Sequence, residues 1–167
     1  METEKQQLFR QTAAQLGTAG FRIECQDESR PWGGFFVIDE SQAQQFADAY
    51  FGGLSVEQLR IAGQLSPKIL LVAPQQRLSW QYHHRRAEIW QVLQGPVSVA
   101  ISDTDTQGEV RNLAVGECII LRQGERHRLV GLQDWGVVAE IWQHTDAAHS
   151  SDEDDIVRVQ DDFGRTA

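Results

Sequence analysis

Short apolar runs separated by turn residues fill the second part of the chain, and this pattern constrains the fold more than any other feature. From Pro67 onward the runs are KILLVA, LSWQYHH, AEIWQVL, PVSVAIS, VRNLAV, ECIIL, HRLVGL and WGVVAEIW. Turn signals separate them, namely Pro74, Gly95-Pro96, DTDTQG, Gly116, Gly124 and Gly136. Short strands at this spacing predict an all-β fold, an antiparallel barrel or jelly roll.

The N-terminal part shows helical periodicity instead. Residues 3–17 are predicted to form a helix, because apolar residues recur at near-helical spacing and glycines follow. RPWGGFFVIDE at 30–40 predicts a turn and a short strand. Ser41 and Gln44 predict a capping box that opens a helix reaching about Tyr50, and a second helical turn is expected after it.

These patterns divide the chain into two regions of one structural domain. Residues 1–65 are expected to form an N-terminal helical extension, with the RPWG strand and a polar-faced helical insertion at one edge of the fold. Residues 66–165 are expected to form the barrel and a C-terminal tail. In that tail SDEDD predicts a solvated or ion-paired segment, whereas IVRVQDDF predicts a segment that docks. At 167 residues the chain is long enough for one real core.

Charge and composition exclude several classes of partner. The formal net charge is -9, so neither a nucleic acid nor an anionic membrane is an expected partner. No apolar run approaches the roughly 18 residues of a membrane helix, and the polar N-terminus lacks the apolar core of a signal peptide. We therefore expect a cytoplasmic protein. Cys25 and Cys118 match neither a zinc spacing nor a disulfide framework, and each is predicted to be a small buried residue.

A polar cluster lies inside the strand-rich stretch WQYHHRRAEIW. Alternate residues of a strand share a face, so Gln81 and His83 point the same way, and Glu88 returns to that place on the next strand. His127 is the fourth candidate. Two nitrogens and two oxygens at one point predict a divalent metal site, for Zn²⁺ first, with Fe²⁺, Mn²⁺, Co²⁺ or Ni²⁺ as alternatives.

The spacing of these residues resembles the two-part metal motif of the cupin superfamily. Its first part runs from Gln75 through Gln81, His83 and Glu88 to Gly95, and its second part from Gly116 through Arg122 and Gly124 to His127. Four positions depart from the motif. Gln75 replaces a turn glycine, Arg122 a proline, Gly131 a common asparagine and Gln81 the first histidine.

The Gln-x-His pair resembles the phosphomannose isomerases, whose metal is held by Gln, His, Glu and His. The wider similarity is to the type II family, in which the isomerase domain follows a nucleotidyltransferase in longer proteins. Four blocks carry it in the same order: RPWG (30–33), LSWQYHHRRAEIW (78–90), GERHRLVG (124–131) and EDDIVRVQDDFGR (153–165). Arg85 and Ile89 stand where that family commonly has histidines. The resemblance implies a cupin jelly-roll barrel, an antiparallel double-stranded β-helix, with N-terminal helical additions.

The resemblance also implies an activity. The implied protein is a metal-dependent aldose–ketose isomerase that acts through an enediol intermediate. Its implied reaction converts mannose 6-phosphate to fructose 6-phosphate, or acts on a related sugar phosphate. Charged side chains are expected to hold the phosphate, chiefly Lys68, Arg86 and Arg158, with Arg85 and Arg165 as further candidates. Arg85 and Arg86 are expected on a turn at the mouth of the site. The proton-transfer base stays open among Lys68, His84, Glu140 and Arg158.

Two other functions remain open. One is a metal-bearing cupin that binds a sugar or small acid without isomerising it. The other is an oxygenase, which Gln81 disfavours because such sites use three histidines, or two with a carboxylate and Fe²⁺. The strand aromatics are expected to be core residues rather than sugar-stacking ones, and His144 and His149 are expected at the surface. Cupins often pair through sheet edges, so the resemblance implies a homodimer.

Overall fold

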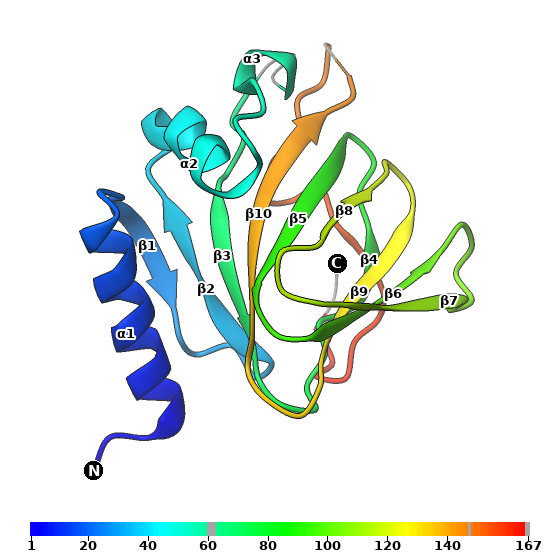
Figure 1. Ribbon diagram of the computed structural model, residues 1–167. Helices are drawn as coiled ribbons and strands as arrows, with labels where there is room; N and C mark the ends of the chain where they lie inside the picture. Colours follow the sequence, from blue (N-terminus) through cyan, green and yellow to red (C-terminus); the bar gives the residue numbers. More distant parts are fainter. Residues whose placement is uncertain (60–62, 147, 166–167) are drawn as a thin grey trace.

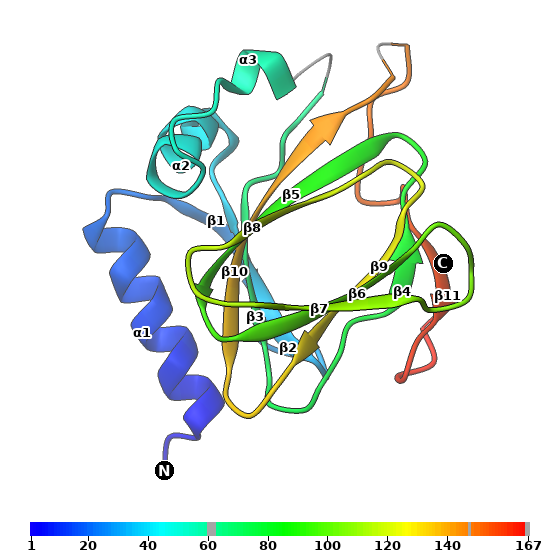
Figure 2. The same cartoon turned by 45° about the vertical axis from the view of Figure 1, so that its right-hand side comes forward.

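The computed structural model describes residues 1–59, 63–146 and 148–165, which form a barrel of two antiparallel sheets with helices on one side (Figure 1). The order of the first sheet is β1-β2-β3-β10-β5-β8, and that of the second is β11-β4-β9-β6-β7. Turning the molecule by 45° shows the two sheets facing each other across the barrel (Figure 2). The predicted jelly-roll barrel with N-terminal helical additions is confirmed.

The strands are short, as the spacing of the turn signals predicts. The first sheet contains β1 (Ile23–Asp27), β2 (Gly33–Ile38), β3 (Lys68–Val72), β5 (Arg86–Gln94), β8 (Cys118–Leu121) and β10 (Gly136–His144). The second contains β4 (Trp80–Tyr82), β6 (Val97–Ser102), β7 (Glu109–Leu113), β9 (Arg126–Gly131) and β11 (Val157–Gln160). The helices are α1 (Glu4–Thr18), the 3-10 turn η1 (Glu40–Gln42), α2 (Ala43–Tyr50) and α3 (Val56–Leu59).

Alternation along the strands gives the barrel interior an apolar end and a polar end. Leu70 and Val72 of β3 pack with Val92 and Val138 in the apolar cluster. Further toward the other end of the same strands the inward positions carry charge, on Lys68, Arg86, Glu88 and Glu140. Because burying a charge is costly unless it is paired, these groups must compensate one another.

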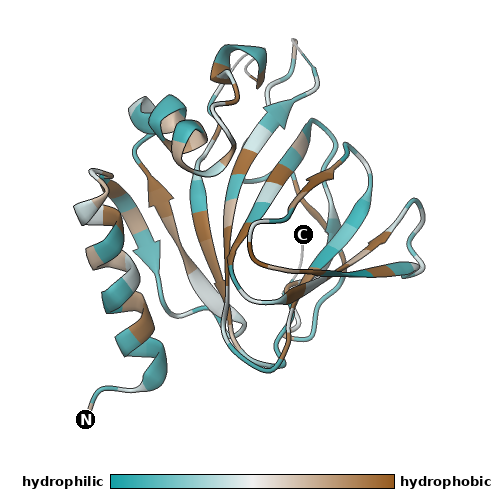
Figure 3. Cartoon of the chain, in the orientation of Figure 1, coloured by the Kyte–Doolittle hydropathy of each residue, from teal (hydrophilic) through white to brown (hydrophobic). Residues whose placement is uncertain are grey.

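Helix α1 covers the outer face of the first sheet. Thr3 and Gln6 form a capping box at its start, and its Phe9 and Leu16 pack against the outward side chains of β2 and β3. The apolar segments of these strands are visible in Figure 3. In the described part of the chain, no helix is both long and apolar enough to span a membrane.

The helical insertion packs on the barrel rather than decorating an edge. Apolar residues of α2 and α3, together with Leu65, cluster with Ile89 of β5 and Ile141 of β10. The predicted Ser41–Gln44 capping box is wrong, because the Asp39 carboxylate accepts the backbone N–H of Ser41 and opens η1 instead. The Gln44 side chain reaches forward, and its oxygen accepts the N–H of Val56.

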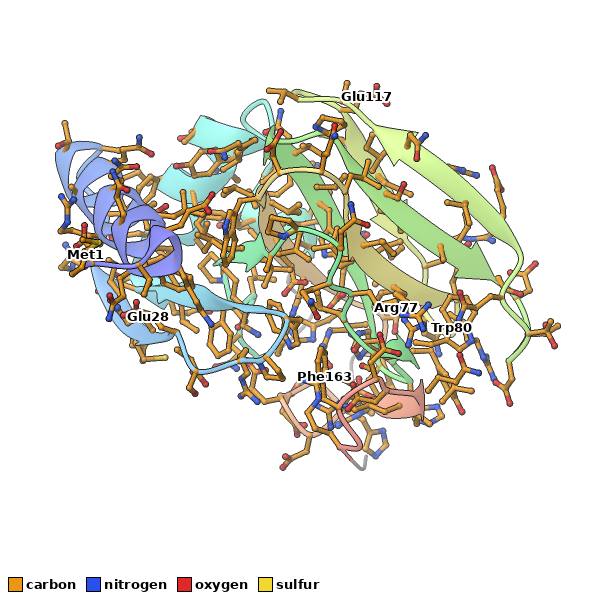
Figure 4. The ribbon with its side chains drawn as sticks, turned by 90° about the horizontal axis from the view of Figure 1, so that it is seen from below. Met1, Glu28, Arg77, Trp80, Glu117 and Phe163 are labelled. Carbon is orange, nitrogen blue, oxygen red and sulfur yellow. The ribbon has the colours of Figure 1, made fainter. Side chains whose placement is uncertain are left out.

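The C-terminal tail docks on the second sheet as β11, which pairs with β4 and brings Arg158 opposite Gln81. Beyond it, the Arg77 guanidinium forms two hydrogen bonds with Asp162, at 2.6 and 2.9 Å. Figure 4 shows Arg77, Trp80 and Phe163 at this end of the molecule, away from Met1 and α1. The C-terminal tail and β4, which are distant in the sequence, are therefore neighbours in the second sheet.

Three predictions of burial are wrong, each because of a strand's position in its sheet. Cys25 and Cys118 are exposed, since they lie on β1 and β8, the two edge strands of the first sheet. His144 is buried at the polar end of β10, where its ring bonds the carbonyl of Gln64 and the N–H of Ser151. His149 is exposed, as predicted.

The departures from the cupin motif have local explanations. Gln75 adopts φ 61° in place of the turn glycine, and its side chain donates to the Leu132 carbonyl. Arg122 uses the backbone N–H that a proline would lack, donating it to Glu125. At Gly131 a Cβ atom would lie 2.1 Å from the Ala73 carbonyl oxygen, so an asparagine does not fit this backbone.

We predict that Gly33→Ala destabilises the fold. Gly33 has φ +145°, and an added Cβ would lie 1.9 Å from the Leu71 carbonyl oxygen of β3. The free energy of unfolding in urea should fall by about 2–4 kcal/mol. Gly17→Ala is the control, since Gly17 is helical with nothing within 4 Å of the added atom, and this variant should gain about 0.5–1 kcal/mol. Equal stability of the two variants would contradict the backbone geometry at Gly33.

Candidate metal centre and substrate cavity

A cavity of about 160 Å³ opens at the polar end of the barrel. Both sheets contribute to its wall, as do the turn before β2 and the C-terminal tail. Predicted site residues that line it are Lys68, Gln81, Arg86, Glu88, Glu140, Arg158 and Arg165. Another cavity, of about 130 Å³, lies beneath α1, but the described residues around it include no charged side chain. The chemistry therefore belongs to the barrel cavity.

Three of the predicted metal ligands form a close group beside this cavity, and one of them, Glu88, lines it. His83 follows β4, Glu88 lies on β5 and His127 on β9, and one ligand atom from each lies within 4.8 Å of the others. The Nε2 atoms of His83 and His127 are 3.4 and 3.2 Å from the two carboxylate oxygens of Glu88. All three side chains are buried, with 3% exposure or less.

Hydrogen bonds to the backbone set the orientation of both imidazole rings. His83 Nδ1 lies 2.6 Å from the Asp155 carbonyl oxygen, and His127 Nδ1 lies 3.0 Å from that of Glu125. A carbonyl only accepts, so each Nδ1 carries the proton, and the lone pair of each Nε2 faces Glu88. A hydrogen bond from Nδ1–H to a backbone carbonyl is what fixes the tautomer of many metal-binding histidines.

Asp155 holds His83 in place from the C-terminal tail. Its carboxylate accepts the N–H groups of His84 and Arg85, at 2.8 and 3.0 Å, and the hydroxyl of Ser151 at 2.7 Å. Burial opposes ionisation, but these hydrogen bonds keep the pKa of Asp155 below its usual value. This role was not predicted, because Asp155 lies in the SDEDD segment, which was expected to be solvated or ion-paired. Its place in the EDDIVRVQDDFGR block was the available signal.

The three residues fit a divalent metal. Glu88 Oε1 and His127 Nε2 are buried 3.2 Å apart, and neither has a hydrogen-bond partner among the described residues. Two acceptors that face each other in a buried site favour a cation between them. Burial lowers the pKa of the His83 imidazole. Burial also opposes ionisation of Glu88, yet His83 and Arg86 hold the pKa of that carboxyl well below its usual value. Metal binding needs these deprotonated states.

Gln81, the fourth predicted ligand, lies on the neighbouring wall. It is paired with His127 between β4 and β9 and lines the cavity. Its side-chain oxygen accepts the Ser79 hydroxyl. Its coordination of a metal stays a prediction.

Arg86 is buried inside the barrel, not exposed on a turn as the sequence suggested. It is the first residue of β5, and alternation turns it toward Glu88, whose carboxylate accepts its Nε–H at 3.1 Å. The guanidinium also donates to Ser151 Oγ and to the Asp152 carbonyl, and it stacks on Trp142 at 3.8 Å. Arg86 therefore compensates the buried charge of Glu88.

The other candidates occupy distinct places. Lys68 Nζ forms an ion pair of 2.7 Å with Glu153, so this part of the acidic segment is ion-paired, as predicted. Arg85 donates to the Ser150 carbonyl and pairs with Asp152. His84, a candidate for the proton-transfer base, is exposed, with its ring against Tyr82.

Glu140 stands out among the candidates for a proton-transfer base. It is buried on β10, lines the cavity, and accepts the indole N–H of Trp90 at 2.8 Å. Burial, together with the nearby negative charge of Glu88, raises the pKa of Glu140 to about 7. A carboxyl group with such a pKa can both accept and return a proton near neutral pH.

Fold and site together define a cupin, and solved structures bear out the fold. KdgF from Halomonas sp. aligns with a TM-score of 0.51 at 14% sequence identity, covering 74% of this chain and 88% of that one. CapF from Staphylococcus aureus aligns with a TM-score of 0.54 at 11% identity, covering 84% of this chain and 34% of that one. At such identities the likeness concerns the fold alone.

The chain belongs to the family described as Mannose-6-phosphate isomerase C-terminal, which matches residues 22–161. It is 30% identical over 136 residues to the mannose-1-phosphate guanylyltransferase ManC of Salmonella typhimurium, covering 81% of this chain and 22% of that protein. The xanthan biosynthesis protein XanB of Xanthomonas campestris is 31% identical over 137 residues, with 82% and 23% covered. The chain thus spans about a quarter of the length of these relatives.

We predict that His127→Ala and Glu88→Gln each lower the bound divalent metal at least 10-fold while the barrel persists, because each removes a ligand atom from a buried site. Zn²⁺ content after dialysis, read by mass spectrometry, gives the stoichiometry, and circular dichroism reports the fold. His84→Ala is the matched control, since the His84 ring lies outside the group of three and should leave the metal content unchanged. A full equivalent of metal in a folded His127→Ala protein would rule out this centre.

Proposed function

We propose that this chain is a metal-dependent aldose–ketose isomerase of sugar phosphates, acting on mannose 6-phosphate or a related aldose phosphate. The observation that carries the proposal is that Glu140, a buried carboxyl group with a pKa of about 7, lines the same cavity as Glu88, which belongs to the buried His83–Glu88–His127 group. Proton transfer between adjacent carbons needs such a base, together with stabilisation of negative oxygen.

His83, Glu88 and His127 are the residues that would hold the metal, with Gln81 as the fourth ligand and Zn²⁺ as the first candidate. A divalent cation held there supplies Lewis-acid stabilisation of the substrate oxygens on which negative charge develops. Arg86 positions Glu88 and compensates its charge. Lys68, Arg86 and Arg158 contribute positive charge to the cavity wall, which suits an anionic substrate.

Glu140 would perform the proton transfer. As a carboxylate it takes the proton from C2 of the open-chain aldose, the electrons of that C–H bond form the C1=C2 double bond, and the former carbonyl oxygen takes up a proton to give the enediol. Return of the proton from Glu140 to C1, with loss of the proton on the C2 hydroxyl, gives the ketose. The reaction is redox-neutral overall and needs no further reactant.

The comparisons support the substrate class. The family description names mannose-6-phosphate isomerase, and the relatives include a mannose-1-phosphate guanylyltransferase. The aligned region covers 22% of that relative, so the choice of mannose 6-phosphate is part of the proposal.

Incubation of the metal-loaded protein with mannose 6-phosphate in D₂O tests the reaction. We expect fructose 6-phosphate to form and deuterium to appear at C2 of the recovered mannose 6-phosphate, both read by proton NMR. A spectrum without exchange or product, for this and related aldose phosphates and with the metal confirmed bound, would reject the isomerase in favour of a metal-bearing cupin that only binds its ligand.

Glu140→Gln should lower kcat by about 10²- to 10⁴-fold, because an amide cannot take up the C2 proton. The variant keeps its shape and its ability to accept the Trp90 N–H, so metal content and KM should change little. Glu109→Gln, on the exposed face of β7, is the matched control and should retain wild-type kcat. Wild-type turnover in Glu140→Gln would assign the base to another residue.

A further inference from the structure

A group of arginines, Arg30, Arg158 and Arg165, lines the outer part of the barrel cavity. The Arg30 and Arg165 side chains are 39% and 22% exposed, whereas those of Arg86 and Glu88, deeper in the barrel, are 5% and 3% exposed. The group therefore lies nearer to solvent than the metal centre does, where an incoming ligand meets it first.

Three separate segments bring these arginines together. Arg30 lies in the turn before β2, Arg158 on β11, and Arg165 in the turn that follows β11. The first and last are held by carboxylates. Arg30 Nε is 3.0 Å from Asp27, and Arg165 donates from Nε and from a terminal nitrogen to Asp161, at 2.7 and 2.9 Å. Such anchoring orients a planar guanidinium before a ligand arrives.

The arginines are close enough to influence one another electrostatically. Burial lowers the pKa of Arg158, and the positive charges of Arg165 and Arg30 lower it further. This crowding of cations occurs in a chain whose formal net charge is -9. A local concentration of guanidinium groups against the overall sign favours an anion, and planar donor pairs match phosphate oxygens.

Lys68 and Arg86 are the other cations of the cavity wall. Lys68 is paired with Glu153, and Arg86 is bound to Glu88, Ser151 and the Asp152 carbonyl. Recruiting Arg86 to a ligand would leave the charge of Glu88 less compensated in a buried place. Arg86 therefore serves Glu88 rather than a ligand, and the phosphate-binding role that the sequence suggested for Lys68 stays a prediction.

The spacing between this group and the metal centre suits an extended ligand. Arg158 lies opposite Gln81 between β11 and β4, and Gln81 lies opposite His127 between β4 and β9. Two strand spacings, about 10 Å, thus separate the backbones of Arg158 and His127. A sugar with its carbonyl end at the metal centre and its far end at Arg158 would lie along this wall.

We propose that Arg30, Arg158 and Arg165 form a subsite for the terminal phosphate of an open-chain sugar phosphate, with Arg86 acting as a positioning residue for Glu88. The choice of sugar rests on the proposed isomerase function, whereas the affinity for a phosphate monoester does not. The signal for Arg30 in the sequence was its place in the RPWG block, for which only a turn, a strand and a family resemblance were predicted.

Titration calorimetry of the metal-loaded full-length chain with inorganic phosphate, and then with mannose 6-phosphate, tests the subsite. Arg158→Gln should raise both dissociation constants about 10- to 100-fold, the effect of losing a charge-assisted contact. Arg158→Lys keeps the charge but loses the planar guanidinium, so its dissociation constants should lie between those of Arg158→Gln and the wild type. Arg111→Gln is the matched control, since Arg111 is exposed on β7 and paired with Glu109, and it should bind like the wild type.

Arg30→Gln provides a second variant, to be used if circular dichroism shows that Arg158→Gln does not fold. Its dissociation constant for phosphate should rise about 10-fold. Unchanged phosphate affinity in a folded Arg158→Gln or Arg30→Gln protein would overturn the subsite, even if isomerisation proceeds normally. Loss of phosphate affinity in these variants would support it, even if the wild type isomerises no sugar phosphate. In an active enzyme, Arg158→Gln should raise KM far more than it lowers kcat at saturating substrate.

Discussion

The carboxylate of Glu88 inside the barrel is the constraint on which the rest of the site depends. A buried negative charge needs compensation, and here the Arg86 guanidinium supplies part of it, while two imidazole rings turn Nε2 lone pairs toward the carboxylate oxygens and so favour a cation between them. Trp142 covers the Arg86 guanidinium, and the backbone fixes the tautomers of His83 and His127. If Glu88 were neutral or exposed, the site would contain no buried negative charge for these contacts to stabilise.

The C-terminal tail completes this arrangement from outside the barrel. The backbone carbonyl of Asp155 orients His83, its carboxylate caps the turn between β4 and β5, and Glu153 neutralises Lys68. The strand that follows places Arg158 beside Gln81. One docked segment thus supports a candidate ligand, closes the cavity wall and brings a cation to its mouth. A substitution in the tail would therefore alter the candidate metal centre as well as the surface.

Much of the architecture could be predicted from periodicity and spacing. Alternation placed His83 and Glu88 together, because the period of a strand is two, and the turn glycines marked where each strand ends. The errors arose where a neighbour along the chain is not the neighbour in space. Arg86 was expected on a turn, but strand β5 begins at this residue. Asp155 was expected in a solvated or ion-paired segment, but it is buried, where its carboxylate accepts two backbone N–H groups of a sequence-distant turn and the hydroxyl of Ser151.

The sequence by itself determined the strand-rich fold, the helix at its start and the residue types that gather at the polar end of the barrel. These follow from local rules, since a strand's faces and a helix's caps depend on residues close in the chain. Only the tertiary structure decided which charges compensate each other, how deep each group lies, and that Glu140 shares a cavity with Glu88 of the candidate metal centre. Burial and pairing depend on contacts between distant segments, and no local pattern encodes them.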